Sequence, residues 1–297
     1  MTTILLTGRD GQVGWELQRS LAPLGQLVAC GRAELDLTSP DSIRTRVREV
    51  KPDIIVNAAA YTTVDKAESE PALAGAVNGV APGILAEEAR RLGALLVHYS
   101  TDYVFDGEKF EPYVENDAPN PLNEYGRSKL AGERAIDAAG CAHLIFRTTW
   151  VYAPRGKNFL LTILRLARER DELRIVADQM GAPTSAAAIA QATARVIEEV
   201  GLWPREPDPR WGVYHLAAKG KTSWFGFTES ILDRAAFMVP ARPRLTPIPS
   251  SEYPTPARRP RCSVLDCEKF HGRFRFDLAP WDQALDEVIT ELRSRPI

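Results

Sequence analysis

A tyrosine and a lysine near the middle of the chain have the spacing of a catalytic pair. Tyr125 and Lys129 are four residues apart, so in a helix both side chains lie on one face. A phenol, with a pKa of about 10, exchanges protons poorly at neutral pH, and a nearby cation lowers that pKa toward the working range. The pair therefore predicts general acid–base chemistry, in which the Lys129 ammonium tunes the Tyr125 phenol.

Two hydroxyl side chains stand at a second place where chemistry is expected. Ser100 and Thr101 follow the apolar run 94–99, which reads as a strand. Ligands of open α/β sheets bind beyond the carboxyl ends of the strands, so these hydroxyls are expected to hydrogen-bond a substrate oxygen. The alternative is that Thr101 only caps the turn that follows.

A glycine-rich turn opens the chain. Gly8, Gly11 and Gly14 follow the apolar run 4–6 and precede leucines at helical spacing. The pyrophosphate of a dinucleotide binds backbone N–H groups at a helix N-terminus, and glycines permit that approach. The turn predicts a dinucleotide site, and an ordinary tight turn is the alternative.

The end of the second expected strand bears on the choice of cofactor. Residues 27–30 are followed by Gly31 and Arg32, where NAD-binding folds usually carry a carboxylate. A guanidinium can bind the 2′-phosphate of NADPH bidentately. We therefore expect NADPH, with NADH as the alternative, because Glu34 or Asp36 could instead occupy Arg32 in an ion pair.

Strand and helix patterns alternate along the first half of the chain. Strands are expected at 27–30, 53–58, 94–100 and 144–147, and helices at 84–92 and 126–139. This alternation predicts an α/β fold with a Rossmann-type, doubly wound parallel sheet. Residues 1–150 are expected to form the NADPH-binding domain. Residues 151–297 are expected to form a smaller α/β part that binds the substrate and packs closely on the first, with an exchange of segments left open.

The second half of the chain lacks the regular alternation of strand and helix patterns. It shows helical patterns at 158–170, 186–200 and 281–292, and short strand patterns at 174–176 and 213–216. Seven prolines lie between positions 240 and 260. We expect this stretch to be an extended loop, since proline lacks the N–H that regular structure needs.

Composition excludes several classes of function. The 37 basic and 39 acidic residues give a net charge of −2, without the basic surface that nucleic-acid binding requires. The N-terminus has no basic region before its apolar run, and no uncharged apolar stretch approaches the roughly 20 residues of a membrane span. The four cysteines form no CxxC pair and the four histidines are isolated, so we predict no metal site and reduced thiols in the cytoplasm.

Longer strings resemble one family. The glycine turn, the strand-end Ser/Thr and the Tyr/Lys pair, in that order, are similar to the extended short-chain dehydrogenase/reductases. More narrowly, several strings resemble the dTDP-4-dehydrorhamnose reductase family. They are 11–17 (GQVGWEL), 57–62 (NAAAYT), 64–68 (VDKAE), 100–105 (STDYVF), 147–152 (RTTWVY), 181–184 (GAPT) and 253–257 (YPTPA). The resemblance implies reduction of the 4-keto group of a dTDP-linked 6-deoxyhexulose by NADPH to give dTDP-L-rhamnose, a precursor of bacterial surface polysaccharides.

The resemblance also implies roles for individual residues. Tyr125 would be the proton donor, Lys129 would lower its pKa and bind the cofactor ribose, and Thr101 would be their hydroxyl partner. Thr101, Asp102 and Trp150 would contact the substrate. The implied cofactor contacts are Gly11, Gln12, Val13, Asp36, Leu37, Ala60, Tyr61 and Thr62, beside the glycine turn itself.

Two departures from the family pattern bear on cofactor and assembly. Gly31 stands where some members carry an acidic residue, which puts the use of NADH in doubt. Ala187 stands where some members carry a glutamate tied to Mg²⁺ and dimerisation. We therefore expect activity without added Mg²⁺, and the Ala-rich helix 186–200 suits packing within a monomer or a homodimer contact.

Two other functions are compatible with the same fold. One is a related sugar-nucleotide reductase or epimerase, and the other is a non-catalytic regulatory subunit that binds a nucleotide. The intact Thr101, Tyr125 and Lys129 argue against the second, because a binding module needs no tuned phenol.

Overall fold

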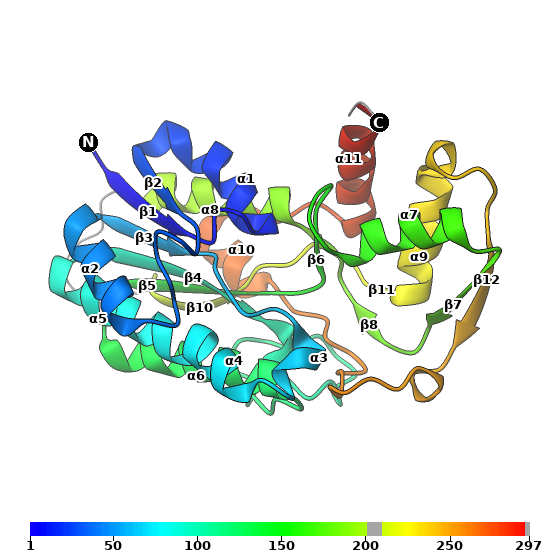
Figure 1. Ribbon diagram of the computed structural model, residues 1–297, viewed down its shortest axis with the longest axis horizontal. Coiled ribbons are helices and arrows are strands. Elements are labelled where there is room, and N and C mark those ends of the chain that lie inside the picture. Colours follow the sequence, from blue (N-terminus) through cyan, green and yellow to red (C-terminus); the bar gives the residue numbers. More distant parts are fainter. Residues whose placement is uncertain (201–209, 295–297) are drawn as a thin grey trace.

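A six-stranded parallel sheet forms the centre of the computed structural model, which describes residues 1–200 and 210–294 (Figure 1). Its strand order is β2-β1-β3-β4-β5-β10, and every neighbouring pair is parallel. The strands are β1 (Thr3–Thr7), β2 (Gln26–Cys30), β3 (Ile54–Asn57), β4 (Leu95–Thr101), β5 (His143–Thr148) and β10 (Gly212–His215). The order reverses between β1 and β3, and such a switch point opens a crevice at the carboxyl ends of the strands.

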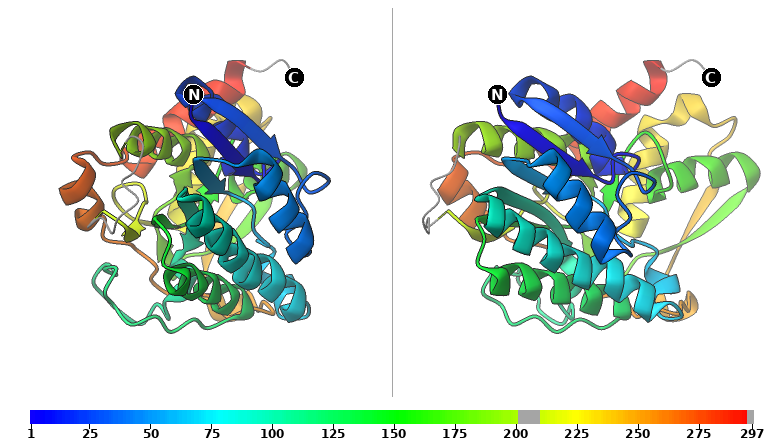
Figure 2. Two further views of the ribbon diagram at one scale, coloured as in Figure 1. Left: turned by 90° about the vertical axis from the view of Figure 1, so that its left-hand side faces the viewer. Right: turned by 60° about the vertical axis from the view of Figure 1, so that its left-hand side comes forward.

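Helices cover both faces of this sheet (Figure 2). One face packs against α1 (Gln12–Leu21), α8 (Ala186–Val200) and α10 (Glu268–Phe274). The other packs against α2 (Pro40–Val50), α5 (Ala81–Leu92) and α6 (Glu124–Ala139). The strands β3 and β4 are buried along their whole length, because they have helices on both sides. The predicted Rossmann-type, doubly wound sheet is confirmed.

Local sequence signals set the ends of several helices. Ser39 and Asn123 cap α2 and α6, each accepting a backbone N–H with its side chain. Gly93 and Gly140 end α5 and α6 with φ of +67° and +65°, a left-handed conformation that glycine adopts without strain. The remaining helices near the sheet are α3 (Val64–Ala67), α4 (Pro71–Gly75) and a π-helical turn at Ala76–Val80. Single 3₁₀ turns lie at Ala22–Leu24, Asp102–Val104, Ala236–Met238 and Ser250–Glu252.

Segments from the second half of the chain complete the central sheet. The strand β10 is the edge strand beside β5, and α8 packs along α1. The sixth strand and two covering helices, α8 and α10, therefore come from residues beyond 150.

A second lobe lies beside the carboxyl ends of the sheet (Figure 1). Its core joins the helices α7 (Phe159–Glu169), α9 (Trp224–Arg234) and α11 (Trp281–Ser294) to the parallel pair β7 (Glu172–Val176) and β12 (Arg244–Ile248). Two short ladders pair β6 (Val151–Tyr152) with β9 (Thr184–Ser185), and β8 (Met180–Gly181) with β11 (Thr222–Ser223). Within the described residues, no helix has the length and apolarity to cross a membrane.

The proline-rich stretch is where the sequence prediction is wrong. Five of its residues form β12 instead of an extended loop. Among the residues that the structure describes, this strand has a partner on one side only, and Arg244 donates its N–H to Asp171 O of the partner segment. Alternate residues face the partner, so the nitrogen of Pro247 faces away, where no N–H is needed.

Candidate active site

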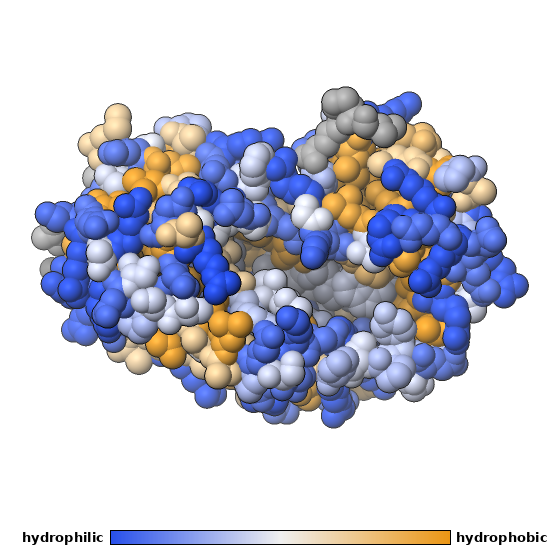
Figure 3. Space-filling view, viewed as in Figure 1, coloured by the Kyte–Doolittle hydropathy of each residue, from blue (hydrophilic) through white to orange (hydrophobic). Residues whose placement is uncertain are grey.

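The predicted site residues meet at one cleft. It has a volume of about 970 Å³ and lies between the carboxyl ends of the sheet strands and the second lobe, where the surface is hollowed (Figure 3). The sequence-predicted residues that line it are Gly8, Gly11, Gln12, Val13, Arg32, Asp36, Leu37, Ala60, Tyr61, Thr62, Thr101, Asp102, Tyr125, Lys129 and Trp150. Gly14 does not line it.

The glycine turn forms one end of the cleft. Gly8 has φ of +71°, and a Cβ there would lie 2.6 Å from the backbone nitrogen of Ala59. Gly11 donates its N–H to Gly8 O at 2.9 Å and caps α1, so the N-terminus of this helix faces the cleft. Gly14 serves packing instead, because a Cβ there would collide with Gly8 O. These features fit a dinucleotide pyrophosphate at the N-terminus of α1.

The residues after β2 leave Arg32 available to a ligand. Glu34 pairs with Arg9 at 2.7 Å and accepts the N–H of Gly31 at 3.0 Å. Asp36 accepts both the N–H and the hydroxyl of Thr38. Neither carboxylate therefore forms the ion pair with Arg32 that was the alternative, and Arg32 is exposed and forms no ion pair within residues 1–200 and 210–294.

The loop after β3 is fixed by a buried asparagine. Asn78, in the π-helical turn, accepts the N–H of Tyr61 at 2.8 Å and donates to Tyr61 O at 2.9 Å. It also donates to Ser128 Oγ of α6 at 3.0 Å. This side chain therefore holds residues 60–62 against the helix that carries Tyr125 and Lys129, a link that the sequence reasoning missed.

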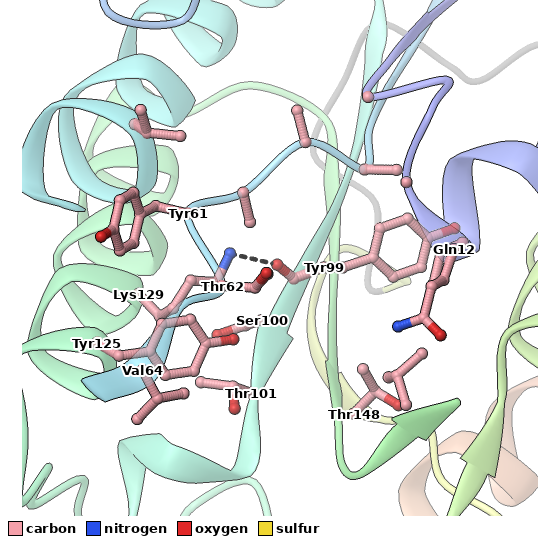
Figure 4. A pocket seen from close by; sticks show the side chains of 18 of the residues that line it. Gln12, Tyr61, Thr62, Val64, Tyr99, Ser100, Thr101, Tyr125, Lys129 and Thr148 are labelled. Atoms are coloured by element: carbon pink, nitrogen blue, oxygen red, sulfur yellow. Dashed lines mark hydrogen bonds between the residues drawn. The ribbon is translucent and has the colours of Figure 1, made fainter. Parts of the chain in front are cut away.

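The start of α6 is anchored from both lobes. Asn123 accepts the N–H of Gly126 at 2.8 Å and donates to Arg258 O at 2.8 Å, while Glu68 accepts the N–H of Glu124 at 2.8 Å. These bonds fix the first turn of the helix, and with it Tyr125, whose ring packs edge-on against Tyr103. The side chains of Tyr125, Lys129 and Thr101 lie close together in the cleft (Figure 4).

The electrostatics of Tyr125 differ from the sequence prediction. Burial raises the pKa of the phenol to about 12, and the neighbouring Thr101 hydroxyl only partly opposes this. Lys129 does not lower it, because its Nζ donates to Tyr99 O at 2.6 Å and lies 3.1 Å from His98 Nε2. Burial lowers the pKa of Lys129 itself to about 8. The predicted tuning of the phenol by the cation is wrong for this structure, which keeps Tyr125 protonated.

The two strand-end hydroxyls have separate partners. Ser100 donates to Glu133, which also forms a bidentate ion pair with Arg147 at 2.9 and 2.6 Å. The Ser100 hydroxyl is therefore engaged in the protein and not offered to a substrate, contrary to the expectation. Thr101 Oγ1 contacts Asp102 Oδ1 at 3.0 Å and accepts the N–H of Tyr103 at 3.2 Å. Thr101 thus caps the following turn and still lies against the phenol.

Asp102 is a buried carboxyl close to Tyr125. Only 1% of it is exposed, and burial raises its pKa to about 6. Hydroxyl donors partly offset that burial, among them Thr149, whose Oγ1 lies 2.7 Å from Asp102 Oδ2. The cleft therefore holds a carboxyl that changes its charge near neutral pH.

An aromatic wall faces these groups from the second lobe. Trp150 has φ of +45°, and its indole stacks on Trp224. Phe159 packs against Trp224 with the ring centroids 4.4 Å apart, and all three aromatic side chains line the cleft. Trp224 was missed by the sequence reasoning, because its position at the start of α9 gives no signal of proximity to Trp150.

Two strings of the family pattern meet at the cleft's edge. Asp65 accepts the N–H of Ala257 at 3.2 Å and pairs with Arg259 at 2.9 Å. Arg259 lines the cleft and was also missed. Thr148 adds a polar group there, since its buried Oγ1 has no hydrogen-bond partner among the described residues. Within residues 1–200 and 210–294, no cluster of three or more His, Cys, Asp or Glu side chains is suited to hold a metal.

Comparison with known proteins gives one family. The model of the RmlD substrate binding domain matches residues 1–294. The dTDP-4-dehydrorhamnose reductase of Burkholderia thailandensis is 51% identical, over 98% of this chain and 99% of its own length. That of Escherichia coli K12 is 48% identical, over 97% of each chain. The crystal structure of the Bacillus anthracis dTDP-4-dehydrorhamnose reductase with NADP has a TM-score of 0.90 at 33% identity, covering 98% of this chain and 100% of that one. With its fold, its cleft and these full-length matches, the chain belongs to the RmlD substrate binding domain family.

Proposed function

We propose that this protein reduces the 4-keto group of dTDP-4-dehydro-L-rhamnose to give dTDP-L-rhamnose, with NADPH as reductant. The observation that carries the proposal is the place of Tyr125, a protonated phenol against Thr101 at the carboxyl end of β4. The high identity to curated dTDP-4-dehydrorhamnose reductases supports this choice of substrate.

The residues around the cleft fit the cofactor. The N–H groups at the start of α1 would bind the pyrophosphate, and Arg32 would bind the 2′-phosphate. Asp36, Leu37 and residues 60–62 would enclose the adenine side and the middle of the cofactor. Bound NADPH supplies a hydride to the carbonyl carbon.

The protein's own groups supply the other half of the reduction. Tyr125 donates its proton to the carbonyl oxygen as that oxygen becomes negative, and solvent later returns the proton to the phenolate. Because the pKa of Tyr125 is about 12, the phenol is fully protonated at neutral pH before the step. Thr101 donates to Asp102 and contacts the phenol, and Lys129 would bind the cofactor ribose. Positioned proton transfer of this kind contributes roughly 10²- to 10⁴-fold in rate.

The second lobe would hold the sugar nucleotide. Trp150 and Trp224 offer flat apolar surface to a ring, and Arg259 offers a guanidinium to an anionic group. We propose that residues 1–150 mainly bind the cofactor and that the part after residue 150 mainly binds the substrate. The product is an activated sugar, suited to polysaccharide assembly, and the four free cysteines accord with a cytoplasmic location.

Product analysis tests the proposal. The protein is incubated with dTDP-4-keto-6-deoxy-L-sugar and NADPH, and the product is identified by NMR and mass spectrometry. We expect one NADPH to be consumed per sugar and the C4 stereochemistry of L-rhamnose in the product. An epimerase would change the sugar without net consumption of NADPH, and a regulatory subunit would bind both ligands and leave them unchanged.

A further inference from the structure

A row of polar side chains crosses three neighbouring strands at one level of the central sheet. Thr7 on β1 pairs with Asn57 on β3, and Asn57 pairs with His98 on β4. Each of the three is only 1% exposed. Burying three polar side chains costs free energy unless they bond to one another or to a further group.

These side chains form a hydrogen-bonded chain that ends at Lys129. Thr7 Oγ1 lies 2.6 Å from Asn57 Oδ1, and Asn57 Nδ2 lies 3.0 Å from His98 Nδ1. His98 Nε2 lies 3.1 Å from Lys129 Nζ. At its other end the chain adjoins the glycine turn, because Thr7 precedes Gly8 and its hydroxyl accepts the N–H of Ala59. The row therefore connects the cofactor turn with Lys129. The Nζ of Lys129 also donates to Tyr99 O (Figure 4).

The direction of these hydrogen bonds depends on the charge of Lys129. An ammonium can only donate, so His98 Nε2 must then accept, and the imidazole proton must sit on Nδ1. The Nδ1–H of His98 must then donate to the oxygen of the Asn57 amide, so that this oxygen, and not the amine, faces His98. In the structure the Asn57 amine faces His98, and in that arrangement the proton sits on Nε2 and Lys129 must accept it as an uncharged amine. The amide of Asn57, the tautomer of His98 and the charge of Lys129 therefore change together.

His98 stays neutral in both arrangements. Burial and the adjacent Lys129 hold the pKa of its imidazole well below the ordinary value. We propose that His98 is a positioning residue for the reduction, which fixes the direction of Lys129 Nζ and couples its charge to the orientation of Asn57. This proposal rests on the role that the proposed function gives to Lys129.

The other charged groups around Lys129 are fixed. On α6 the charged group is Glu133, which is matched by Arg147 of β5, and the Tyr125 phenol of the same helix is uncharged. The strand β4 contributes His98, while β1 and β3 contribute only the uncharged Thr7 and Asn57. The polar row is therefore the adjustable partner of the Lys129 amine.

Titration of Lys129 tests the proposal directly. The protein is labelled with ¹³C-lysine, the Lys129 signal is assigned with Lys129→Met, and its pKa is measured by NMR without cofactor or substrate. His98→Leu removes one of two acceptors from a buried ammonium, so we expect the pKa of Lys129 to fall by about one unit or more. Asn57→Asp offers acceptors only, which forces His98 Nε2 to accept, and it adds a negative charge. Both changes favour the ammonium, so we expect that pKa to rise.

Two further variants serve as controls. His98→Gln restores an acceptor and should bring the pKa of Lys129 back toward the wild-type value. His143→Leu removes another buried histidine, one that bonds Cys141 O, and should leave that pKa unchanged. In the reductase assay, the basic limb of the pH profile of kcat/KM should move in the same direction as the titration.

The outcomes separate this proposal from the proposed function. A pKa of Lys129 that does not rise in Asn57→Asp, or does not fall in a folded His98→Leu, overturns the positioning role. If His98→Leu does not fold, Asn57→Asp and His98→Gln decide. A wild-type protein that fails to reduce the dTDP-sugar overturns the proposed function, while the titration still reports on His98.

Discussion

Trp150 and Trp224 stack face to face in the wall of the cleft, with ring centroids 3.4 Å apart and planes inclined by 5°. The Trp150 indole also lies against Gly181, where a Cβ would come within 2.5 Å of the ring. The indole is thus in contact with both a backbone and a second indole. Its position depends on the absence of a side chain at Gly181.

Gly181→Ala should therefore weaken substrate binding. The added methyl displaces the Trp150 indole and disturbs its stack with Trp224, so we expect KM for the dTDP-sugar to rise about tenfold or more with NADPH binding unchanged, since one well-placed contact is worth on the order of 1.4 kcal/mol. Steady-state kinetics measure both values. Gly272→Ala on α10 is the matched control, because nothing lies within 4 Å of the added Cβ.

Tyr125→Phe should remove catalysis and spare the cofactor. The ring remains against Tyr103 while the only proposed proton donor is lost, so kcat should fall by roughly 10² or more. NADPH affinity, measured by fluorescence titration, should stay within about threefold, because the hydroxyl alone carries little binding energy. Turnover within about tenfold of the wild type would contradict the assignment.

Arg32→Ala should change cofactor preference. A well-formed charge-assisted contact with the 2′-phosphate is worth on the order of 1.5–3 kcal/mol, so NADPH should bind roughly 10- to 150-fold more weakly while NADH is nearly unaffected. Isothermal titration with both cofactors measures the difference. Arg44→Ala, an arginine on α2 that pairs with Glu87, is the control. Equal losses for both cofactors would mean that Arg32 does not contact the 2′-phosphate.

Asp102→Asn should stabilise the ligand-free protein at alkaline pH. The folded pKa of Asp102 is raised to about 6, so the stability contributed by its neutral form is present below the unfolded value of 3.8 and is lost as pH rises through 6. An amide cannot ionise, so the variant should exceed the wild type by on the order of 3 kcal/mol at pH 8, and the gap should close by about pH 4. Denaturant unfolding across this range measures it, and a gap independent of pH would exclude ionisation of Asp102 as the cause.

Removal of divalent metals should leave turnover intact. The segment at the start of α8, including Ala187, carries no carboxylate to hold Mg²⁺ at a subunit contact. EDTA-treated protein is assayed for NADPH oxidation, and its mass is followed by light scattering. A loss of activity or mass that added Mg²⁺ restores would show that other carboxylates, such as Glu16 or Glu198, take the role.

The sequence predicted the parts of this fold that depend on local pattern. The runs 54–56 and 95–97 indicated buried parallel strands, and the Tyr125/Lys129 spacing indicated a shared helix face, because both signals follow from backbone geometry. The strand β12 was missed, since its partner β7 lies about 70 residues earlier in the sequence. Because β7 pairs with only one edge of β12, a proline whose nitrogen faces the other edge is tolerated.

The electrostatic features of the site required the folded chain. The spacing of Tyr125 and Lys129 brings them near each other, but the direction of the Lys129 amine is set by His98 and Tyr99 on another element. His98 seemed isolated in the sequence, because its partners Asn57 and Lys129 are 41 and 31 positions away. Burial, which raises the pKa of Tyr125, likewise depends on contacts that local pattern does not contain.

The late entry of β10 into the sheet constrains how this protein is made. Until residues 212–215 leave the ribosome, β5 has an unpaired edge. Likewise, the apolar side of α1 stays uncovered until α8 has been made. At about 5–20 residues per second, synthesis exposes the edge of β5 for several seconds, and this side of α1 for on the order of ten seconds or more. A nascent chain stopped at residue 150 would therefore carry a sheet that pairs with other chains, and a chaperone that shields β5 should raise the yield of the full-length protein.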